Sequence, residues 1–250
     1  MQGTPAHVAP ARIPREVVSY SRRDGRLDPR RQKAWDAHHA AYLIEPSRGL
    51  RNTSIDPSWQ LDLAAAFGWM PGQRRPLVVE VGSGTGDVLL DAARRHPDVA
   101  YLGVEVYLPG IATTLIRAAR ENLTNVRLLS AEAGAVLATA LPAGGVADLW
   151  VFFPDPWPKL RHHKRRLVTG PFLDAAARVL QPGGVLRLAT DWPDYAVQME
   201  SVARDHPSFE GGVGERGHRP QTRFERKGLA AGRAVTDLVF HRREEPAWPS

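Results

Sequence analysis

The sequence predicts an α/β fold built on a doubly wound, mainly parallel sheet. Its 250 residues, 43% of them hydrophobic, are enough for one such domain with a sizeable core. From Leu77 onward, apolar segments typical of buried strands alternate with amphipathic segments typical of helices. We expect strands at residues 77–81, 100–106, 125–130, 147–153 and 185–190, and helices at residues 87–95, 110–122, 171–180 and 193–205.

The two ends of the chain differ from this alternating part. Residues 11–33 carry eight Lys or Arg against three acids, a pattern typical of a flexible basic arm or of a plain solvated tail. We therefore divide the chain into a basic, partly flexible N-terminal extension (residues 1–60) and one α/β domain (residues 61–245). Beyond Gly211 the sequence is loop-like until residues 234–242, which we expect to form a last strand, antiparallel at the sheet edge.

Composition narrows the chemistry and the partners. The chain has no cysteine, which excludes disulfides, thiolate zinc sites, iron–sulfur clusters and cysteine nucleophiles. Its net charge of +6 favours an acidic partner, and its 33 basic residues include only four lysines. Arginine suits bidentate phosphate contacts, although a genomic bias towards arginine gives the same composition. No apolar run is long enough for a membrane span or a signal core, so we expect a soluble, cytoplasmic protein.

A glycine-rich turn follows the first expected strand and contains Gly82, Gly84 and Gly86. Such a turn lets the atoms of a nucleotide-type cofactor approach the backbone closely. The spacing is G-x-G-x-G, whereas dinucleotide enzymes have G-x-G-x-x-G, and Glu80 stands two residues ahead of the first glycine. Because an anion there disfavours a pyrophosphate and suits an ammonium and a sulfonium group, we expect S-adenosylmethionine in preference to NAD.

Two further acids follow the next two expected strands. Glu105 ends the second strand, where a carboxylate can accept hydrogen bonds from both hydroxyls of a ribose, or can be an ordinary surface acid. Glu132 follows the third strand and is placed to accept a hydrogen bond from an adenine amino group. The alternative for Glu132 is an acid at the N-terminus of a helix, where the helix dipole stabilises a negative charge.

The fourth strand leads into a proline-rich turn, Phe152-Phe153-Pro154-Asp155-Pro156-Trp157-Pro158-Lys159. Its prolines hold Asp155 and Trp157 in a defined geometry, which suits the binding of a flat base. Trp157 either stacks on that base or packs beneath the turn. A basic run follows, in which we expect phosphate contacts from Arg161, Lys164, Arg165 and Arg166 unless the run is a solvated loop. His162 and His163 lack a third partner at metal-ligand spacing, so we expect no metal.

These motifs resemble those of bacterial tRNA (guanine-N7)-methyltransferases of the TrmB type. The resemblance covers roughly residues 77–240 and rests on the glycine turn, Gly103-Val104-Glu105-Val106 with Pro109-Gly110, residues 152–168, Ala189-Thr190-Asp191-Trp192 and residues 219–228. It extends more faintly to residues 19–26. The glycine turn is shared by many methyltransferases, whereas the blocks around Asp155 and Thr222 are specific. The resemblance implies a Rossmann-like, class I S-adenosylmethionine-dependent methyltransferase whose partner is tRNA. We expect no obligatory protein partner.

The resemblance also implies roles for single residues. S-adenosylmethionine is expected on Glu80, Glu105, Glu132 and Asp155, and a variable-loop guanine of tRNA on Lys159, Asp191, Thr222, Arg223, Phe224 and Glu225. The family commonly has Asp-Ala where this chain has Glu132-Ala133. The side chain expected to contact the adenine is therefore longer by one methylene group. Simpler interpretations stay open: Asp191 as a helix cap, and Thr222 with Glu225 as a capping box. We also expect Arg219 and Arg223 near phosphates.

The chemistry of N7 methylation agrees with these residues. Guanine N7 has an exposed lone pair, so its attack on a sulfonium methyl group needs no deprotonation and no covalent adduct, and leaves S-adenosylhomocysteine. Methylation at a pyrimidine C5 usually needs a cysteine, which this chain lacks. Asp155 is the candidate catalytic residue, supporting the developing positive charge or anchoring the N–H edge of the guanine, unless it only caps the turn.

Two other classes of function stay open. An NAD-dependent oxidoreductase is supported by the glycine turn and Glu105, and opposed by the glycine spacing and by the lack of a Tyr-x-x-x-Lys relay. Titration with NAD and with S-adenosylmethionine separates these two. A non-catalytic RNA-binding protein is supported by the basic arm and the net charge, and would incorporate no methyl groups into tRNA.

Overall fold

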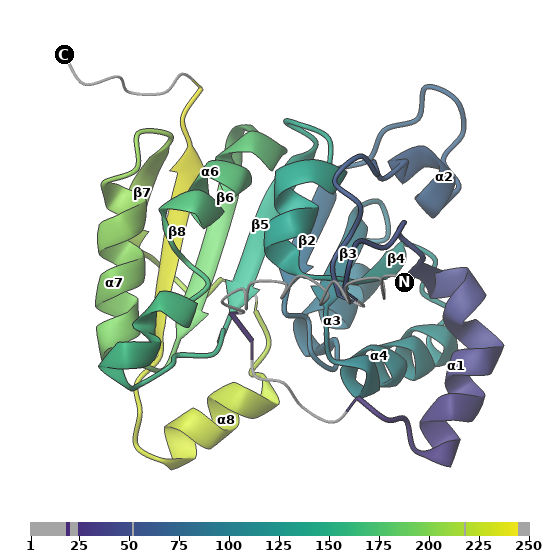
Figure 1. Cartoon of the computed structure of the whole chain (residues 1–250), viewed down its shortest axis with the longest axis horizontal. Helices are drawn as coiled ribbons and strands as arrows, with labels where there is room; N and C mark the ends of the chain where they lie inside the picture. The colour runs from purple at the N-terminus through teal and green to yellow at the C-terminus, as the bar shows by residue number, and fades with distance from the viewer. Residues whose placement is uncertain (1–18, 21–24, 52, 218, 245–250) are drawn as a thin grey trace, which may run out of the picture.

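The computed structural model describes residues 19–20, 25–51, 53–217 and 219–244, which form one mixed sheet with helices packed on both faces (Figure 1). The strands are β1 (Leu43–Ile44), β2 (Leu77–Val81), β3 (Ala100–Glu105), β4 (Val126–Ser130), β5 (Val146–Phe152), β6 (Leu180–Thr190), β7 (Phe209–Val213) and β8 (Thr236–Arg242). The helices are α1 (Pro29–Tyr42), α2 (Leu63–Phe67), α3 (Asp87–Arg95), α4 (Leu108–Arg120), α5 (Ala133–Ala135), α6 (Gly170–Val179), α7 (Pro193–Arg204) and α8 (Arg223–Ala230).

The order of the strands confirms the predicted fold class. The sheet runs β1-β4-β3-β2-β5-β6-β8-β7, and all pairings among β1 to β6 are parallel. The strand β8 is antiparallel to both of its neighbours, β6 and β7. The carboxyl ends of the parallel strands therefore meet at one edge of the sheet, and Figure 1 shows α8 beside the ends of β5 and β6.

Local sequence patterns locate most of the elements well. The strand β2 and the helix α3 have the predicted bounds, and the other predicted helices differ by one or two residues at their ends. The strand β6 begins at Leu180, five positions before the predicted start, because Leu180 already pairs with Val146 across an irregularity in the register. A Pro-Gly-Gly turn inside this strand hides that pairing in the sequence.

The N-terminal extension contributes to the same sheet and core. Asp28 caps α1 by accepting a hydrogen bond at 2.9 Å from the backbone N–H of Arg31, so the last residues of the predicted flexible arm are helical. Most of residues 11–24 in that predicted arm lie outside the described ranges. The strand β1 pairs with β4, so the sheet continues into the predicted extension.

The C-terminal part is more regular than its sequence indicates. The predicted last strand is confirmed as the antiparallel β8, but β7 forms the edge of the sheet beyond it. Glycine weakens the strand signal of β7, yet Gly211 is required there because a Cβ atom would lie 2.1 Å from the carbonyl oxygen of Val239. The helix α8 follows in the segment that we expected to be a loop.

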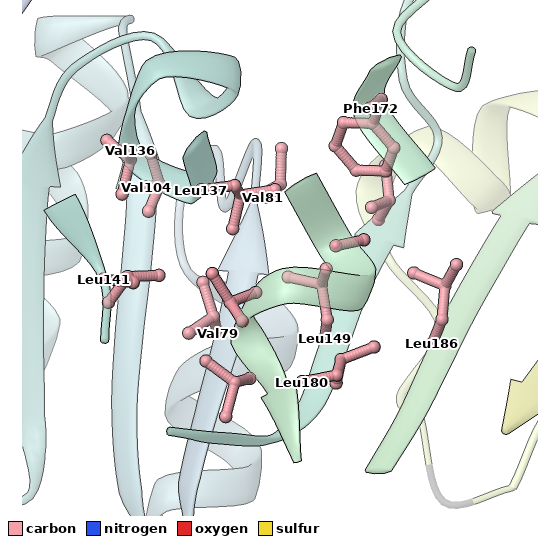
Figure 2. Packing of buried hydrophobic residues seen from close by; sticks show 14 of the residues in the cluster. Val79, Val81, Val104, Val136, Leu137, Leu141, Leu149, Phe172, Leu180 and Leu186 are labelled. Carbon is pink, nitrogen blue, oxygen red and sulfur yellow. The ribbon is translucent and has the colours of Figure 1, made fainter. Parts of the chain in front are cut away.

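The core consists of two clusters on the opposite faces of the sheet. Along β2, Val79 and Val81 pack with α6 and α7, whereas Val78 packs with α3 and α4. Figure 2 shows the first cluster, in which Leu149 of β5 lies at the centre between Val79 and Leu186. None of the helices in the described ranges is both long enough and apolar enough to cross a membrane.

Truncation of Leu149 tests this core. Its side chain is 0% exposed, so Leu149→Ala leaves a cavity and should lower the free energy of unfolding by about 2–5 kcal/mol in urea denaturation. Val197→Ala on α7 is the control, because Val197 is 69% exposed and its truncation should change the stability by less than about 0.5 kcal/mol. Similar losses in both variants would contradict the packing of β5.

Candidate active site

A cavity of about 480 Å³ opens at the carboxyl ends of β2, β3 and β5, a volume typical of small-molecule sites. Its walls come from the glycine turn, the end of β3, the proline-rich turn after β5, the helix α8 and residues 19–20. This is the edge of an open parallel sheet at which ligands bind.

The glycine turn is built in a conformation that only glycine adopts readily. Gly82, Gly84 and Gly86 have φ angles of 73°, 55° and 74°. Gly86 is the N-cap of α3. Close packing adds a second constraint, since a Cβ atom at Gly110 of α4 would lie 2.6 Å from the carbonyl oxygen of Gly84. The turn thus brings backbone atoms to the cavity wall.

Glu105 ties this turn to the end of β3. One carboxylate oxygen accepts the N–H of Gly84 at 2.8 Å, and the other accepts those of Val106 and Tyr107 at 2.7 and 2.9 Å. A carboxylate has about four acceptor positions, so these three bonds occupy most of its capacity. Glu105 lines the cavity and at the same time fixes the backbone around it.

Glu80 is a buried carboxyl group in the cavity wall. Its side chain is buried, and its Oε2 atom has no hydrogen-bond partner among the described residues. Burial, with smaller contributions from the negative charges of Glu105 and Asp87, raises the pKa of Glu80 to about 8. In the ligand-free protein at neutral pH, this carboxyl group is therefore mostly protonated.

Glu132 is held by two hydroxyl groups from the N-terminal part of the chain. Its Oε1 atom accepts hydrogen bonds from Thr53 at 2.8 Å and from Tyr20 at 3.1 Å. It precedes α5 but makes no side-chain capping bond. Its neighbours Ala131 and Ala133 line the cavity, whereas Glu132 itself is not part of the wall.

The proline-rich turn places Asp155 in the wall beside Phe152, Phe153 and Pro154. Phe153 and Trp157, on either side of Asp155, have positive φ angles of 53° and 46°, which are uncommon outside glycine. The backbone N–H of Phe153 donates to the carbonyl oxygen of Ala189 in β6 at 2.8 Å. Asp155 is thus partly buried in a turn that neighbouring elements hold in place.

Trp157 packs within the protein. Its Nε1–H donates to the carbonyl oxygen of Ser19 at 3.1 Å, and the guanidinium of Arg165 lies 3.5 Å from its ring centre. Arg165 also donates to the carbonyl oxygen of Tyr20 at 3.3 Å. These contacts favour the packing role over base stacking, and they attach residues 19–20, which line the cavity, to the segment around Trp157 and Arg165.

The basic run is divided between solvent and interior. Lys159 precedes a 3₁₀ segment (Leu160–Arg165), in which Arg161 and Lys164 are exposed. Arg166 is buried, and its guanidinium donates to Asp194 at 2.5 Å and to two further acceptors. This position does not fit a contact with RNA phosphate, so the phosphate role expected for Arg166 is withdrawn.

The helix α8 carries the Thr222 block to the cavity. Thr222 caps α8 by accepting the N–H of Glu225 at 3.1 Å, as the capping-box spacing indicates, and it also lines the cavity. Glu225 is 1% exposed and is paired with Arg216 and Arg219, the second at 2.8 Å. Arg219 is therefore buried and ion-paired, a position that does not fit the phosphate contact that we expected. The side chains of Arg223 and Phe224 lie outside the described part of the chain.

Asp191 faces α8 and does not cap α7. Its Oδ2 atom accepts a hydrogen bond from Arg233 at 2.8 Å, and the N-cap of α7 is Trp192. Asp191 also packs against the backbone of α8, since a Cβ atom at Gly228 would lie 2.6 Å from Oδ2. The helix-cap alternative for Asp191 is thus not what the structure shows.

The cavity brings together only part of the expected set. Six expected residues line it: Glu80, Gly82, Gly84, Glu105, Asp155 and Thr222. Gly86, Glu132, Lys159, Asp191 and Glu225 lie outside the lining. Sequence reasoning missed Tyr20 and Lys227, which do line it; their only signal was that both fall inside segments of the family resemblance. No group of three potential metal ligands occurs among the described side chains.

Comparisons with known proteins agree with this architecture. Residues 74–238 match the model of a family described as "Putative methyltransferase". In structure, the chain is similar to the 16S rRNA methyltransferase KamB, with a TM-score of 0.54 and 20% identity over 80% of this chain and all of that one. At that level of identity, the likeness concerns the fold.

Curated relatives are much more similar in sequence. A tRNA (guanine-N(7)-)-methyltransferase from a Nocardioides species is 47% identical over 94% of this chain and 91% of its own length. The protein of that name from Alkalilimnicola ehrlichii is 43% identical over 93% and 95%. The protein of that name from Paenarthrobacter aurescens is 48% identical over 77% of this chain. The matched part is 63% of the length of that longer protein. The chain belongs to the family of tRNA (guanine-N(7)-)-methyltransferases.

Proposed function

We propose that this protein transfers a methyl group from S-adenosylmethionine to N7 of a guanine in tRNA, and that the acid-lined cavity beside the Asp155 turn is its active site. The observation that carries the proposal is the combination of acids inside the cavity with exposed cations in the segment that follows the Asp155 turn. The interior suits a small cationic cofactor, and the exterior suits a polyanion.

The residues of the cavity fit S-adenosylmethionine. Glu80 presents a buried carboxyl group whose Oε2 atom has no hydrogen-bond partner in the described part of the chain, and its ionised form suits the ammonium group of the cofactor. Glu105 and the backbone of Gly82 and Gly84 would surround the ribose and the methionine part. Glu132, held by Tyr20 and Thr53, stays a proposed adenine contact. When bound, the cofactor supplies an electrophilic methyl group on a positively charged sulfur.

The guanine would enter beside Asp155. Its N7 lone pair needs no base, so the task of the protein is to orient the purine and to support the positive charge that develops on it. Asp155 is fixed by its turn, and its carboxylate can either orient the purine or support this positive charge. Thr222 is the second residue of the lining that is proposed to contact the substrate.

Asp191 and Glu225 act in a different way in this proposal. Both carboxylates are held by arginines of the same chain, at the two ends of α8. We assign them to the position of α8, which in turn carries Thr222 to the cavity. Lys159, Arg161 and Lys164 are exposed in the segment that follows the Asp155 turn, and they are assigned to the tRNA backbone, together with Arg165.

The direct test of the function is methyl transfer to total tRNA, followed by nucleoside analysis. We expect labelled 7-methylguanosine from the wild type, and at least about a hundredfold less from Asp155→Asn, with S-adenosylhomocysteine binding retained. Asp174→Asn is the matched control, because Asp174 is exposed on α6. A product methylated at N1 or N2 would refute the reaction, and no product at all would favour a non-catalytic RNA-binding protein.

The raised pKa of Glu80 predicts a pH dependence of stability. The folded state keeps Glu80 protonated up to about pH 8, whereas the unfolded chain loses this proton near the ordinary value of 4.5. The free energy of unfolding of the ligand-free wild type should therefore fall as the pH rises between these values. Urea denaturation should show a shallower fall in Glu80→Gln, which cannot ionise.

Glu210→Gln is the matched control for this measurement, because Glu210 is exposed on β7. It should keep the pH dependence of the wild type. If Glu80→Gln and the wild type lose stability in parallel over this range, Glu80 is already ionised in the folded protein.

The exposed cations predict a salt dependence of tRNA binding. Replacing Arg161 and Lys164 together by serine should weaken binding and reduce the slope of log K against log salt by roughly 1.5. Arg74→Ser with Arg120→Ser removes two exposed charges at the opposite edge of the sheet, before β2 and at the end of α4. This control variant should leave the slope nearly unchanged. Equal slopes in the wild type and in both double variants would count against the assignment of Arg161 and Lys164 to the tRNA backbone.

A further inference from the structure

The wall of the cavity holds one positive charge among several negative ones. Of the described residues that line it, Glu80, Asp87, Glu105 and Asp155 are acidic, and Lys227 alone is basic. Within the described ranges, the ammonium group of Lys227 makes no ion pair or hydrogen bond with the protein. This basic side chain is thus placed in the site without a structural partner.

The position of Lys227 follows from the way in which α8 is fixed. Thr222 caps the start of the helix, Glu225 is locked in buried ion pairs, and Gly228 lies against Asp191. Side chains of a helix lean towards its N-terminus, which directs the Lys227 side chain towards the start of α8. Both residues accordingly reach the same cavity.

The charges of the cofactor supply the missing partner. The methionine part of S-adenosylmethionine ends in an ammonium group and a carboxylate. The acids of the wall attract the ammonium group and repel the carboxylate, which needs a cation at short range. We propose that the ammonium group of Lys227 binds this carboxylate, while Glu80 binds the ammonium group. The inference rests on the proposed function, since it takes S-adenosylmethionine as the ligand.

A phosphate of the RNA is the competing partner for Lys227. Lys227 is exposed, as are Arg161 and Lys164, but those two cations, which are assigned to the tRNA backbone, lie outside the lining of the cavity. Lys227 differs from them because it shares the wall with Glu80 and the glycine turn. This placement favours the carboxylate of the small ligand, and the phosphate becomes an outcome of the test.

Calorimetric titration with two ligands tests the proposal without any turnover. The first ligand is S-adenosylhomocysteine, and the second is the analogue in which hydrogen replaces its carboxyl group. The wild type should bind the first about tenfold more tightly than the second. Lys227→Met should lose most of this difference by weakening only the binding of S-adenosylhomocysteine, and Lys227→Arg should retain much of it.

Arg226→Met is the matched control, because it removes one positive charge from the adjacent position of α8 without touching the cavity lining. It should discriminate between the two ligands as the wild type does. Unchanged discrimination in Lys227→Met would overturn the inference, and a lower salt slope of tRNA binding in that variant would assign Lys227 to a phosphate. A wild type that binds neither ligand would instead refute the proposed cofactor.

Discussion

The buried guanidinium group of Arg219 is the interaction on which the arrangement of the site depends. It donates to Glu225 of α8 at 2.8 Å and to Asp237 of β8 at 2.9 Å. Its central carbon also lies 5.1 Å from the ring centres of Phe152 and Phe153, where β5 runs into the proline-rich turn. Removing one member of a buried ion pair costs about 3–5 kcal/mol, because it leaves an uncompensated charge. A helix, a strand and a turn that are distant in the sequence are therefore held as one unit.

The same guanidinium affects the electrostatics of the cavity. Its positive charge lowers the pKa of Glu80, but burial and the carboxylates of Glu105 and Asp87 outweigh this effect. The cavity thus carries excess negative charge inside a protein whose net charge is +6. On the proposed function, a bound ammonium group would stabilise the ionised form of Glu80, so that cofactor binding releases a proton near neutral pH.

The sequence predicts those parts of the site whose signals are local. The glycine turn and the strand ends follow from apolar runs and glycine spacing, which depend on neighbouring residues only. Burial of single arginines is not a local property. The density of cations suggests a phosphate contact for Arg166, and the family resemblance suggests one for Arg219, but Arg166 meets Asp194 28 positions later, and Arg219 meets Asp237 18 positions later. Only the folded chain shows which guanidinium groups already have a carboxylate.

The turn that carries Asp155 shows how such distant contacts set the geometry of a site. Positive φ angles at Phe153 and Trp157 cost roughly 1–3 kcal/mol each, so the turn persists only where its surroundings stabilise it. Here β6 binds the backbone of Phe153, and Trp157 is held by Ser19 and Arg165. The carboxylate between them is consequently held in place by the fold, and on the proposed function this lowers the entropy that must be lost when guanine is oriented against it. Residues 19–20, far from the turn in sequence, thereby help to hold the turn that carries the proposed catalytic residue.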